Sequence, residues 1–482
     1  MKFISIIVIV LLLFQIFTAQ IFATEPVILK HADELIGTSN EIQNTRTLQG
    51  NVQLQQGNVY VKCNSAIQYI NSNKFLLKGN VVITQETLIL ESHSVLYDGN
   101  TYLAVADSSV YITDRKTQLT GKKGTYSTDK MIADFYDDVK LEDDSVCIYA
   151  EYINYDRKTT NSRAIGNVLV KGKDKNIFLE ADTIDNFPQA NTTIAFGNPV
   201  LFQIDTIKSL VQDFLVIDLD VEINLDVQDS IKSSHSEEIN FDTLSIKSDT
   251  MIAFREKGNE KYDFLRNVEI VQNSLKAKAA KAIYLVEIEQ IKLFSNIIEE
   301  TNLQNFLIDS ASESNNVVRN ANAQTIIWLD STQLRSDSVI VQLENRQLKV
   351  IHSYINSIAI MQNNASNLAR IDQLFGNEIV LFIANDTLKK IESNGNAKSV
   401  FFSENNDEPD GVIVINSAEK IIIETENGKA ENIILIKEID GKFHPEQFVF
   451  GQEKEFYLKE FSLDFIDANV IPVKPEIRRK QP

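Results

Sequence analysis

Residues with the chemistry for catalysis or metal binding are few and scattered. The five histidines form neither an HExxH motif nor a cluster with cysteines; they are His31, His93, His235, His352 and His444. His31 beside Asp33 comes nearest to a ligand pair, but a lone surface histidine is several times more common. The acidic run YDDVKLEDD at residues 136–144 is interpreted as a solvated strand face, because carboxylates are abundant throughout. The sequence therefore predicts no catalytic residue, no metal site, no cofactor and no enzymatic activity.

The two cysteines, Cys63 and Cys147, are far apart in the sequence. An exported chain can pair such residues, yet two isolated cysteines do not indicate a disulfide framework. We interpret both as small apolar side chains in the interior or at a sheet edge.

The composition favours a β protein that does not bind nucleic acid. The chain carries 47 Lys and Arg against 67 Asp and Glu, so a polyanion is repelled on average. Isoleucine, valine and other strand-favouring residues are frequent, only 8 prolines occur, and runs with helical period are few. An all-β fold follows, and the length of 482 residues suggests two to three domains.

The N-terminus has the features of a secretory signal peptide. Lys2 precedes an apolar stretch that runs to Phe17, and the small residues Ala19 and Ala23 follow. An uncleaved membrane anchor is the alternative, although the apolar stretch is short for a membrane span. We therefore predict a signal peptide at residues 1–23 and export of the rest of the chain.

A 29-residue period organises the first part of the chain. Five valines keep this spacing: Val52, Val81, Val110, Val139 and Val168. An apolar residue stands two positions after each of them: Leu54, Ile83, Ile112, Leu141 and Val170. In the second copy, Leu88 and Leu90 follow the valine by seven and nine residues, and Tyr97, Tyr126 and Tyr155 follow three of the valines by 16.

Each copy is expected to form two to three short antiparallel strands. Apolar residues at period two indicate strands with one buried face. The intervening stretches YDGNT, YSTDK and YDRKT have the chemistry of hairpin turns. Such a unit cannot bury its apolar face alone, so the copies must stack on one another.

The period weakens after the first block but returns later. Val268, Ile270, Leu275, Ala277 and Tyr284 keep the same offsets, and Ile297 follows Val268 by 29 residues. We divide the exported chain into a first block at residues 24–204, a divergent second block at 205–330 and a C-terminal β-repeat region at 331–470. A basic, proline-rich tail is expected at 471–482, and SSHSEE, within 204–240, is the best candidate for an exposed loop.

Three segments carry a family resemblance. They are GNVQLQQGNV, KGNVVITQETLILESHSVLYD and IGNVLVKGKDKNIFLEADTID, and HADELIG at residues 31–37 precedes them. With this pattern, in which Gly-Asn-Val opens an alternating strand, the sequence resembles the OstA-like, LptA-type family of periplasmic lipopolysaccharide transport. It is also similar to the soluble N-terminal domain of the outer-membrane lipopolysaccharide translocon.

The resemblance implies an open, V-shaped β-jelly roll whose apolar interior holds the acyl chains of lipopolysaccharide or lipid A. Such domains join edge to edge, which implies pairing with other transport proteins or end-to-end self-association. The function implied is that of a periplasmic carrier, soluble or attached to the outer membrane, that serves outer-membrane assembly. The side chains expected to line the groove are Val52, Leu54, Val81, Ile83, Leu88, Leu90, Val110, Ile112, Val139, Leu141, Val168 and Val170.

Alternation alone does not separate a lipid groove from a closed core. A structural or adhesive β-solenoid that binds protein or carbohydrate would show the same valines and leucines, so it stays the alternative. On the carrier hypothesis, replacing Ile83 or Leu141 by glutamate weakens lipid crosslinking and leaves the fold intact. The unpaired strand edge within residues 27–60 is expected to bind a partner strand.

Overall fold

The computed structural model describes residues 25–39, 44–115, 117–173, 176–206, 241–296, 324–329, 331–362, 369–405, 408–426 and 429–461. The predicted signal peptide, the SSHSEE loop, Ile297 and the tail at 471–482 lie outside these residues. The described elements are antiparallel strands and a few short 3-10 helices, so the all-β prediction is confirmed. The chain forms two compact units, Met1–Gly166 and Asn167–Pro482.

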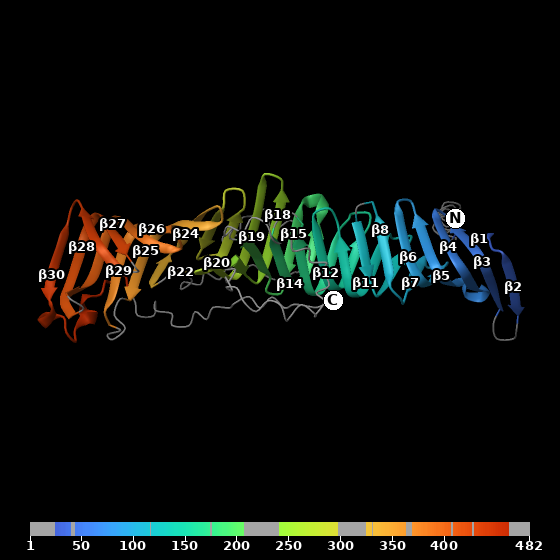
Figure 1. The fold of residues 1–482 in the computed structure, drawn as a ribbon, viewed down its shortest axis with the longest axis horizontal. Helices are drawn as coiled ribbons and strands as arrows, with labels where there is room; N and C mark the ends of the chain where they lie inside the picture. Colours follow the sequence, from blue (N-terminus) through green and yellow to red (C-terminus); the bar gives the residue numbers. More distant parts are fainter. Residues whose placement is uncertain are drawn as a thin grey trace, which may run out of the picture. The chain divides into compact units, whose positions relative to one another are not determined.

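The strands of the first unit follow one another in chain order, as the blue and teal part of Figure 1 shows. They are β1 (Ile28–His31), β2 (Glu34–Ser39), β3 (Asn44–Gln56), β4 (Val59–Tyr69), β5 (Lys74–Gln85), β6 (Leu88–Asp98), β7 (Leu103–Ala106), β8 (Val110–Asp114), β9 (Thr117–Gly121), β10 (Lys123–Ser127), β11 (Ile132–Glu142) and β12 (Val146–Asp156), with η1 (Ile70–Ser72) between β4 and β5. The boundary between the units falls within β13 (Ser162–Gly172).

The strands of the first unit pair into two separate ladders, which we call wall A and wall B. Most long strands contribute one half to each wall, and the pairing register breaks between the halves. Wall A contains residues 52–56, 59–63, 81–85, 88–92, 110–114, 117–121, 139–142 and 146–150. Wall B contains residues 44–49, 65–69, 74–78, 94–98, 103–106, 123–127, 132–136 and 152–156.

Residue pairs with positive φ mark several corners where the chain passes from one wall to the other. In β5 the register breaks around Gly79 (φ 74°) and Asn80 (φ 46°). In β11 it breaks around Asp137 (φ 62°) and Asp138 (φ 52°). Gly57-Asn58 directly precedes β4, so this pair opens a strand, as the sequence predicts. The pairs at residues 50–51 and 79–80 instead form bulges inside longer strands, because a bulge needs the same left-handed backbone as a tight turn.

Most strands are consequently longer than the short strands expected, although two strands per repeat agree with the prediction. β5 has 12 residues and β6 has 11. Hairpin turns do occur at YDGNT, YSTDK and YDRKT, where the sequence predicted them. Most 29-residue copies therefore supply a pair of bent strands. In the others, separate short strands take the place of the wall A half and the wall B half of a bent strand.

Contacts between the far ends of the walls show that the sheet is folded along these corners. A flat strand of 11 residues is about 35 Å long. Gln56 at the wall A end of β3 nevertheless accepts a hydrogen bond of 2.5 Å from Tyr97, near the wall B end of β6. The two walls therefore face each other, with the corners along one side and a mouth along the opposite side.

Replacing Gly79 tests whether the corner depends on the left-handed backbone. A Cβ at Gly79 would lie 2.7 Å from Nδ2 of Asn64, and the positive φ adds strain to any other residue. We expect Gly79→Ala to lower the free energy of unfolding by about 2 kcal/mol, measured by urea denaturation. In the control Gly37→Ala the added methyl meets nothing within 4 Å, so no loss is expected. Equal losses in both variants would contradict this role for the corner.

The second unit repeats the bent strands and the corners. Its strands are β14 (Ile177–Phe187), β15 (Thr192–Phe196), β16 (Val200–Thr206), β17 (Phe241–Lys247), β18 (Thr250–Glu256), β19 (Asn259–Gln272), β20 (Leu275–Leu285), β21 (Gln290–Phe294), β22 (Thr325–Leu329), β23 (Thr332–Ser336), β24 (Ser338–Glu344), β25 (Gln347–Gln362), β26 (Ile371–Ala384), β27 (Thr387–Asn405), β28 (Glu408–Glu426), β29 (Lys429–Ile436) and β30 (Asp440–Pro445). The 3-10 helices are η2 (Pro188–Ala190), η4 (Glu446–Phe448) and η5 (Glu453–Phe456). Arg266 and Asn267, with φ 62° and 47°, form a corner in β19.

Residues 446–461, which follow the last strand, pack against a sheet instead of continuing the repeat. Val449 and Leu458 join a buried cluster with Phe375, Phe402 and Val412 from β26, β27 and β28. We call residues 446–461 the C-terminal strap. The alternation of apolar and polar residues alone would predict that this face of the sheet is exposed to water. The strap covers the face and makes it part of the core.

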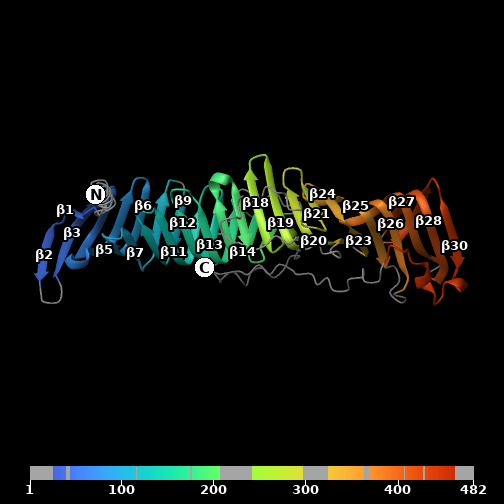
Figure 2. The same ribbon diagram turned by 180° about the vertical axis from the view of Figure 1, so that it is seen from behind.

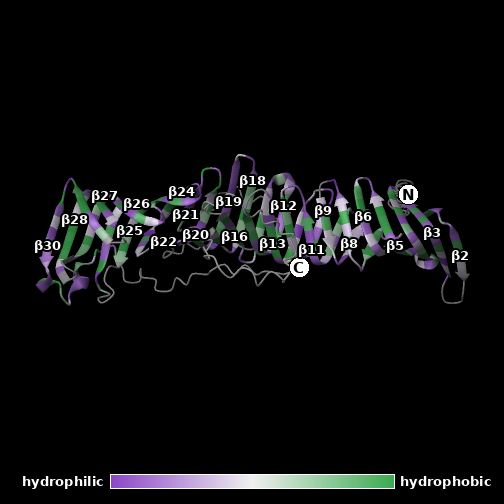
Figure 3. Ribbon diagram, in the orientation of Figure 1, coloured by the Kyte–Doolittle hydropathy of each residue, from purple (hydrophilic) through white to green (hydrophobic). Residues whose placement is uncertain are grey.

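Apolar and polar residues alternate along the strands in both units, as the banding in Figure 3 shows. Figure 2, seen from behind, shows the same succession of strands within each unit. The alternation places one face of each wall toward the interior, since successive side chains of a strand point to opposite faces. The core of the first unit thus lies between wall A and wall B.

Candidate binding interior of the first unit

Ten of the twelve predicted groove residues lie in wall A, and all ten are at most 3 % exposed. Val168 and Val170 belong to the second unit, where Val168 is buried and Val170 is half-buried. The periodic positions thus share one inner face in the first unit. Whether they contact lipid stays a prediction.

The opposite face of the interior comes from wall B, which sequence reasoning missed. Its inward side chains are at most 2 % exposed: Leu48, Ala66, Phe75, Leu77, Val95, Ala104, Phe135 and Ile153. They alternate in the half-strands that precede or follow the corners. The alternation of apolar residues in these half-strands is present in the sequence. It predicts a second wall only if the bulges at the corners are known to separate each strand into two halves.

Side chains fill the interior almost completely. Ile83 and Leu88 on wall A, and Leu77 and Phe135 on wall B, are all 0 % exposed. A ligand with several acyl chains is large, so it fits between the walls only if the walls move apart. The gain in binding must therefore exceed the free energy that keeps the walls together.

Buried glutamine and tyrosine side chains join the two walls at the mouth. Tyr97 donates to Oε1 of Gln56 at 2.5 Å, and Gln56 donates to the carbonyl of Gly99 at 2.7 Å. One repeat further on, Tyr126 donates to Oε1 of Gln85 at 2.7 Å. Gln85 donates to the carbonyl of Thr128 at 2.8 Å. Burial raises the pKa of Tyr97 and of Tyr126 to about 12, so both phenols stay protonated donors.

An ion pair takes the same place in the third repeat. Arg157 Nε donates to Oδ2 of Asp114 at 2.8 Å, and its guanidinium also reaches Glu86 at 3.2 Å. The side chains of Arg157 and Asp114 are only 7 % and 11 % exposed. Burial alone would raise the pKa of Asp114, but hydrogen bonds from Thr87 and Arg157 and the charge of Arg157 outweigh it and lower the pKa.

Comparison with known proteins supports the relationship suggested by the sequence. Residues 24–168 match the family model described as OstA-like protein. This part of the chain is OstA-like. A search of solved structures finds LptH, the LptA homologous periplasmic component of the conserved lipopolysaccharide transport device from Pseudomonas aeruginosa. It shares 16 % identity at a TM-score of 0.21, over 23 % of this chain and 83 % of that chain. A search of curated proteins finds no match.

The acid sensitivity of the Asp114–Arg157 pair in the OstA-like part gives a direct prediction. Because the pKa of Asp114 is lower in the folded state, its stabilising effect is complete above the unfolded value of about 4 and is lost as the pH falls below it. We expect Asp114→Asn to lower the free energy of unfolding by about 2 kcal/mol at neutral pH. The difference from the wild type should shrink as the pH falls below about 4.

Urea denaturation at a series of pH values measures this difference. Asp107→Asn, at an exposed position on the same unit, is the control and should change the free energy of unfolding by less than about 0.5 kcal/mol. A cost of Asp114→Asn that stays constant between neutral and acidic pH would contradict the ion-pair account.

Neither metal binding nor a disulfide is supported by the described residues. His31 Nε2 and Asp33 Oδ1 lie 3.1 Å apart on the surface, as the sequence suggested, but no group of three or more potential metal ligands exists in these ranges. Cys63 and Cys147 are both buried, and no disulfide bond joins them. Burial raises the pKa of the Cys63 thiol to about 11, so it is a poor nucleophile.

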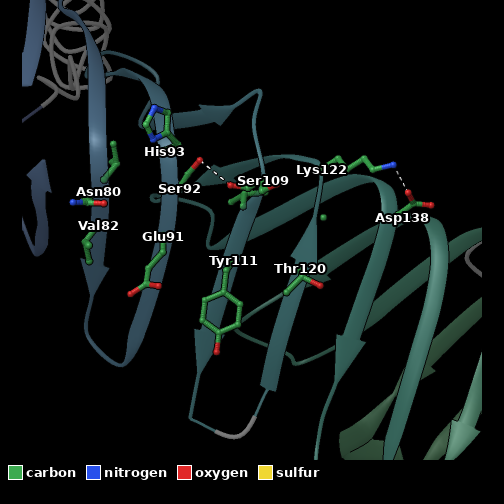
Figure 4. A pocket seen from close by; sticks show the side chains of 13 residues that line it. Asn80, Val82, Glu91, Ser92, His93, Ser109, Tyr111, Thr120, Lys122 and Asp138 are labelled. Carbon is green, nitrogen blue, oxygen red and sulfur yellow. Dashed lines mark hydrogen bonds and ion pairs between the residues drawn. The ribbon is translucent and has the colours of Figure 1, made fainter. Parts of the chain in front are cut away.

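A pocket of about 680 Å³ opens on the outer side of the OstA-like part, near the corners (Figure 4). Its lining includes Val82, Glu91, Tyr111 and Thr120, whose neighbours in sequence point into the interior. Lys122 forms an ion pair with Asp138 at its rim. Glu91, Lys122 and Asp138 in this lining carry charge, which distinguishes the pocket from the apolar interior between the walls.

The first strands leave apolar side chains in water at the edge of the unit. Among the described residues β1 and β2 pair only with β3. Leu35 is 54 % exposed and Ile36 is 51 % exposed on β2. In the part of the chain that the structure describes, no helix has the length and apolarity needed to cross a membrane.

Proposed function

We propose that this chain is a non-catalytic periplasmic carrier that binds the acyl chains of lipopolysaccharide and passes the lipid toward the outer membrane for its assembly. The observation that carries the proposal is the OstA-like match, which coincides with a two-walled unit whose inward side chains are apolar. LptH, named above as a component of a lipopolysaccharide transport device, gives the substrate class.

The chemistry of the interior suits acyl chains. Each methylene group moved from water into an apolar environment contributes about 0.8 kcal/mol. A lipid with several long chains therefore gains enough free energy to separate the walls and replace some of their contacts. Polar groups on the inner faces are concentrated at the mouth, where the sugars of the lipid would meet water.

The closed interior also favours a second candidate, a structural or adhesive β-solenoid that binds protein or carbohydrate. Inner residues that are at most 3 % exposed are what such a solenoid needs. In that case the walls never separate, and the outer surface carries the function. The two candidates differ in whether lipid A binds.

We further propose that the β1 and β2 edge pairs with a strand of another transport protein or of a second copy. An edge strand presents unpaired amide and carbonyl groups that attract a further strand. Ile28, Leu29, Leu35 and Ile36, all at least 41 % exposed, would be covered by such a partner. A monodisperse monomer that captures no transport protein would argue against this pairing.

Native mass spectrometry with lipid extraction tests the carrier function. The protein is purified gently from its own envelope fraction, and a second sample is incubated with lipopolysaccharide. Bound lipopolysaccharide or lipid A in either sample supports a carrier. Protein that is free of lipid and also refuses added lipopolysaccharide supports the solenoid.

A further inference from the structure

The three connections across the mouth of the first unit share one register. Gln56 and Gln85 are 29 residues apart, as are Gln85 and Asp114. Each connects to residues 41 or 43 positions later in the chain, which lie in wall B or directly after one of its strands. We call these connections latches one to three: Gln56 with Tyr97 and Gly99, Gln85 with Tyr126 and Thr128, and Asp114 with Arg157. A polar residue four positions after Val52, Val81 and Val110 thus recurs on an otherwise apolar face.

The latches sit where the walls would part. Gln56, Gln85 and Asp114 each end a wall A half-strand on the side remote from the corners. Their partners lie near or just beyond the remote ends of wall B strands. Because the corners are continuous backbone, only this side of the interior can widen without breaking a strand.

The second unit has related connections of its own. Tyr284 donates to Oε1 of Gln203 at 3.1 Å, and Gln272 donates to the carbonyl of Arg346 at 2.7 Å. Gln272 follows Val268 by four residues, which is the offset of Gln56 from Val52. Recurrence at a fixed offset indicates that the latch belongs to the repeat and is not an accident of one turn.

The strength of a latch suits a closure that can open. A buried hydrogen bond between neutral groups contributes about 1 kcal/mol net, since water replaces it when the walls part. The positive charge of Arg157 also acts on the hydroxyl group of Tyr126 and opposes the rise of its pKa, so the second and third latches are electrostatically coupled. Hydrogen bonds of this strength keep the interior closed when no lipid is bound. The free energy gained when several methylene groups enter the interior is large enough to break them.

We propose that the three latches form a lateral gate, through which the acyl chains of lipid A enter the first unit from the side. This inference rests on the proposed carrier function. It adds the route by which the lipid enters the interior and the contacts that control its entry. The closed state is the one described above, and lipid loading requires the latches to break. Entry along the strand stack from an end would not require it.

A crosslink across the mouth tests the gate. In a background with Cys63→Ala and Cys147→Ala, the changes Glu86→Cys and Lys158→Cys place thiols on the two sides of the third latch, where Glu86 contacts Arg157. A reducible bis-maleimide then ties wall A to wall B. The control ties Glu91→Cys to Tyr111→Cys, which are directly opposed neighbours on wall A.

Loading of radiolabelled lipid A is followed over time in both linked proteins, before and after reduction. The gate predicts that the cross-wall link slows loading by about tenfold or more, that reduction restores it, and that the link within wall A has no effect. Loading at the control rate in the cross-wall protein overturns the gate and leaves the carrier function standing. If the wild type takes up no lipid A, the carrier function and the gate fall together.

A measurement without lipid detects the opening of the gate independently of lipid binding. Cys63 is buried on the inner face of wall A, so opening should expose it to a small maleimide. Tyr126→Phe removes one latch bond and should raise the labelling rate of Cys63 about fivefold, the equivalent of about 1 kcal/mol. Tyr60→Phe, on an exposed side chain, should leave the rate unchanged. Equal rates in a folded Tyr126→Phe variant and the wild type would overturn the gate.

Discussion

Replacing Ile83 by glutamate is expected to unfold or open the first unit. Ile83 is 0 % exposed and is paired with Val61 and Leu90 on wall A. The substitution loses the apolar burial of the isoleucine and places a carboxyl group where the structure offers no partner for it. Together these terms cost about 4 kcal/mol. Thermal unfolding followed by circular dichroism should show a much lower midpoint for the first unit.

Val82→Glu is the matched control, because it changes the next residue of the same strand to the same side chain. Val82 points to the outer face and is half-buried, so the cost should be below about 1 kcal/mol. Similar midpoints for the two variants would show that Ile83 is not in a packed interior. The expectation from the sequence, that a glutamate at Ile83 leaves the fold intact, therefore needs a milder substitution to test lipid contact.

Replacing Arg370 by leucine is expected to release the C-terminal strap. Arg370 is 3 % exposed and lies 2.6 Å from Glu446 and 3.8 Å from Glu453, both in the strap. Its guanidinium also lies over the ring of Phe402 at 5.6 Å. Removing one partner of a buried ion pair costs about 3 kcal/mol or more, because the remaining charges stay buried. The cluster that holds Val449 and Leu458 should open with it.

Limited proteolysis measures this release, since a free strap is cut within residues 446–461 long before the strands are. Lys459→Ala, an exposed change in the same segment, is the control and should leave the cleavage rate near that of the wild type. Cleavage of Arg370→Leu at the control rate would show that the apolar cluster alone holds the strap.

The sequence predicts the inner face of wall A because the repeat places an apolar residue at the same offsets in every copy. Val52, Val81, Val110 and Val139 are all buried as their period requires. Wall B is harder to predict because a Gly-Asn pair is typical of the turn before a strand as well as of a bulge inside one. Positive φ at Gly79 and Asn80 fits a hairpin turn and a bulge equally well, and only the pairing of strands distinguishes them.

The latches illustrate what local patterns cannot provide. Tyr97 and Tyr126 repeat at one offset from the periodic valines, yet their partners Gln56 and Gln85 lie 41 residues away. Joining them requires knowing that the sheet folds along its corners. The C-terminal strap was missed for a different reason. It has no period, and its position depends on the pairing of Arg370 with Glu446, 76 residues later.

Site-specific photocrosslinking tests the central claim, that acyl chains occupy the interior between the walls. Phe135 and Tyr136 are neighbours on β11; Phe135 points inward at 0 % exposure and Tyr136 outward at 42 %. Benzoylphenylalanine replaces each in turn, with Phe75 as a second inward position if the Phe135 variant does not fold. The account predicts crosslinks to lipid A from the inward positions and none from Tyr136. Crosslinks from Tyr136 alone, in folded variants, would place the lipid on the outer surface and contradict it.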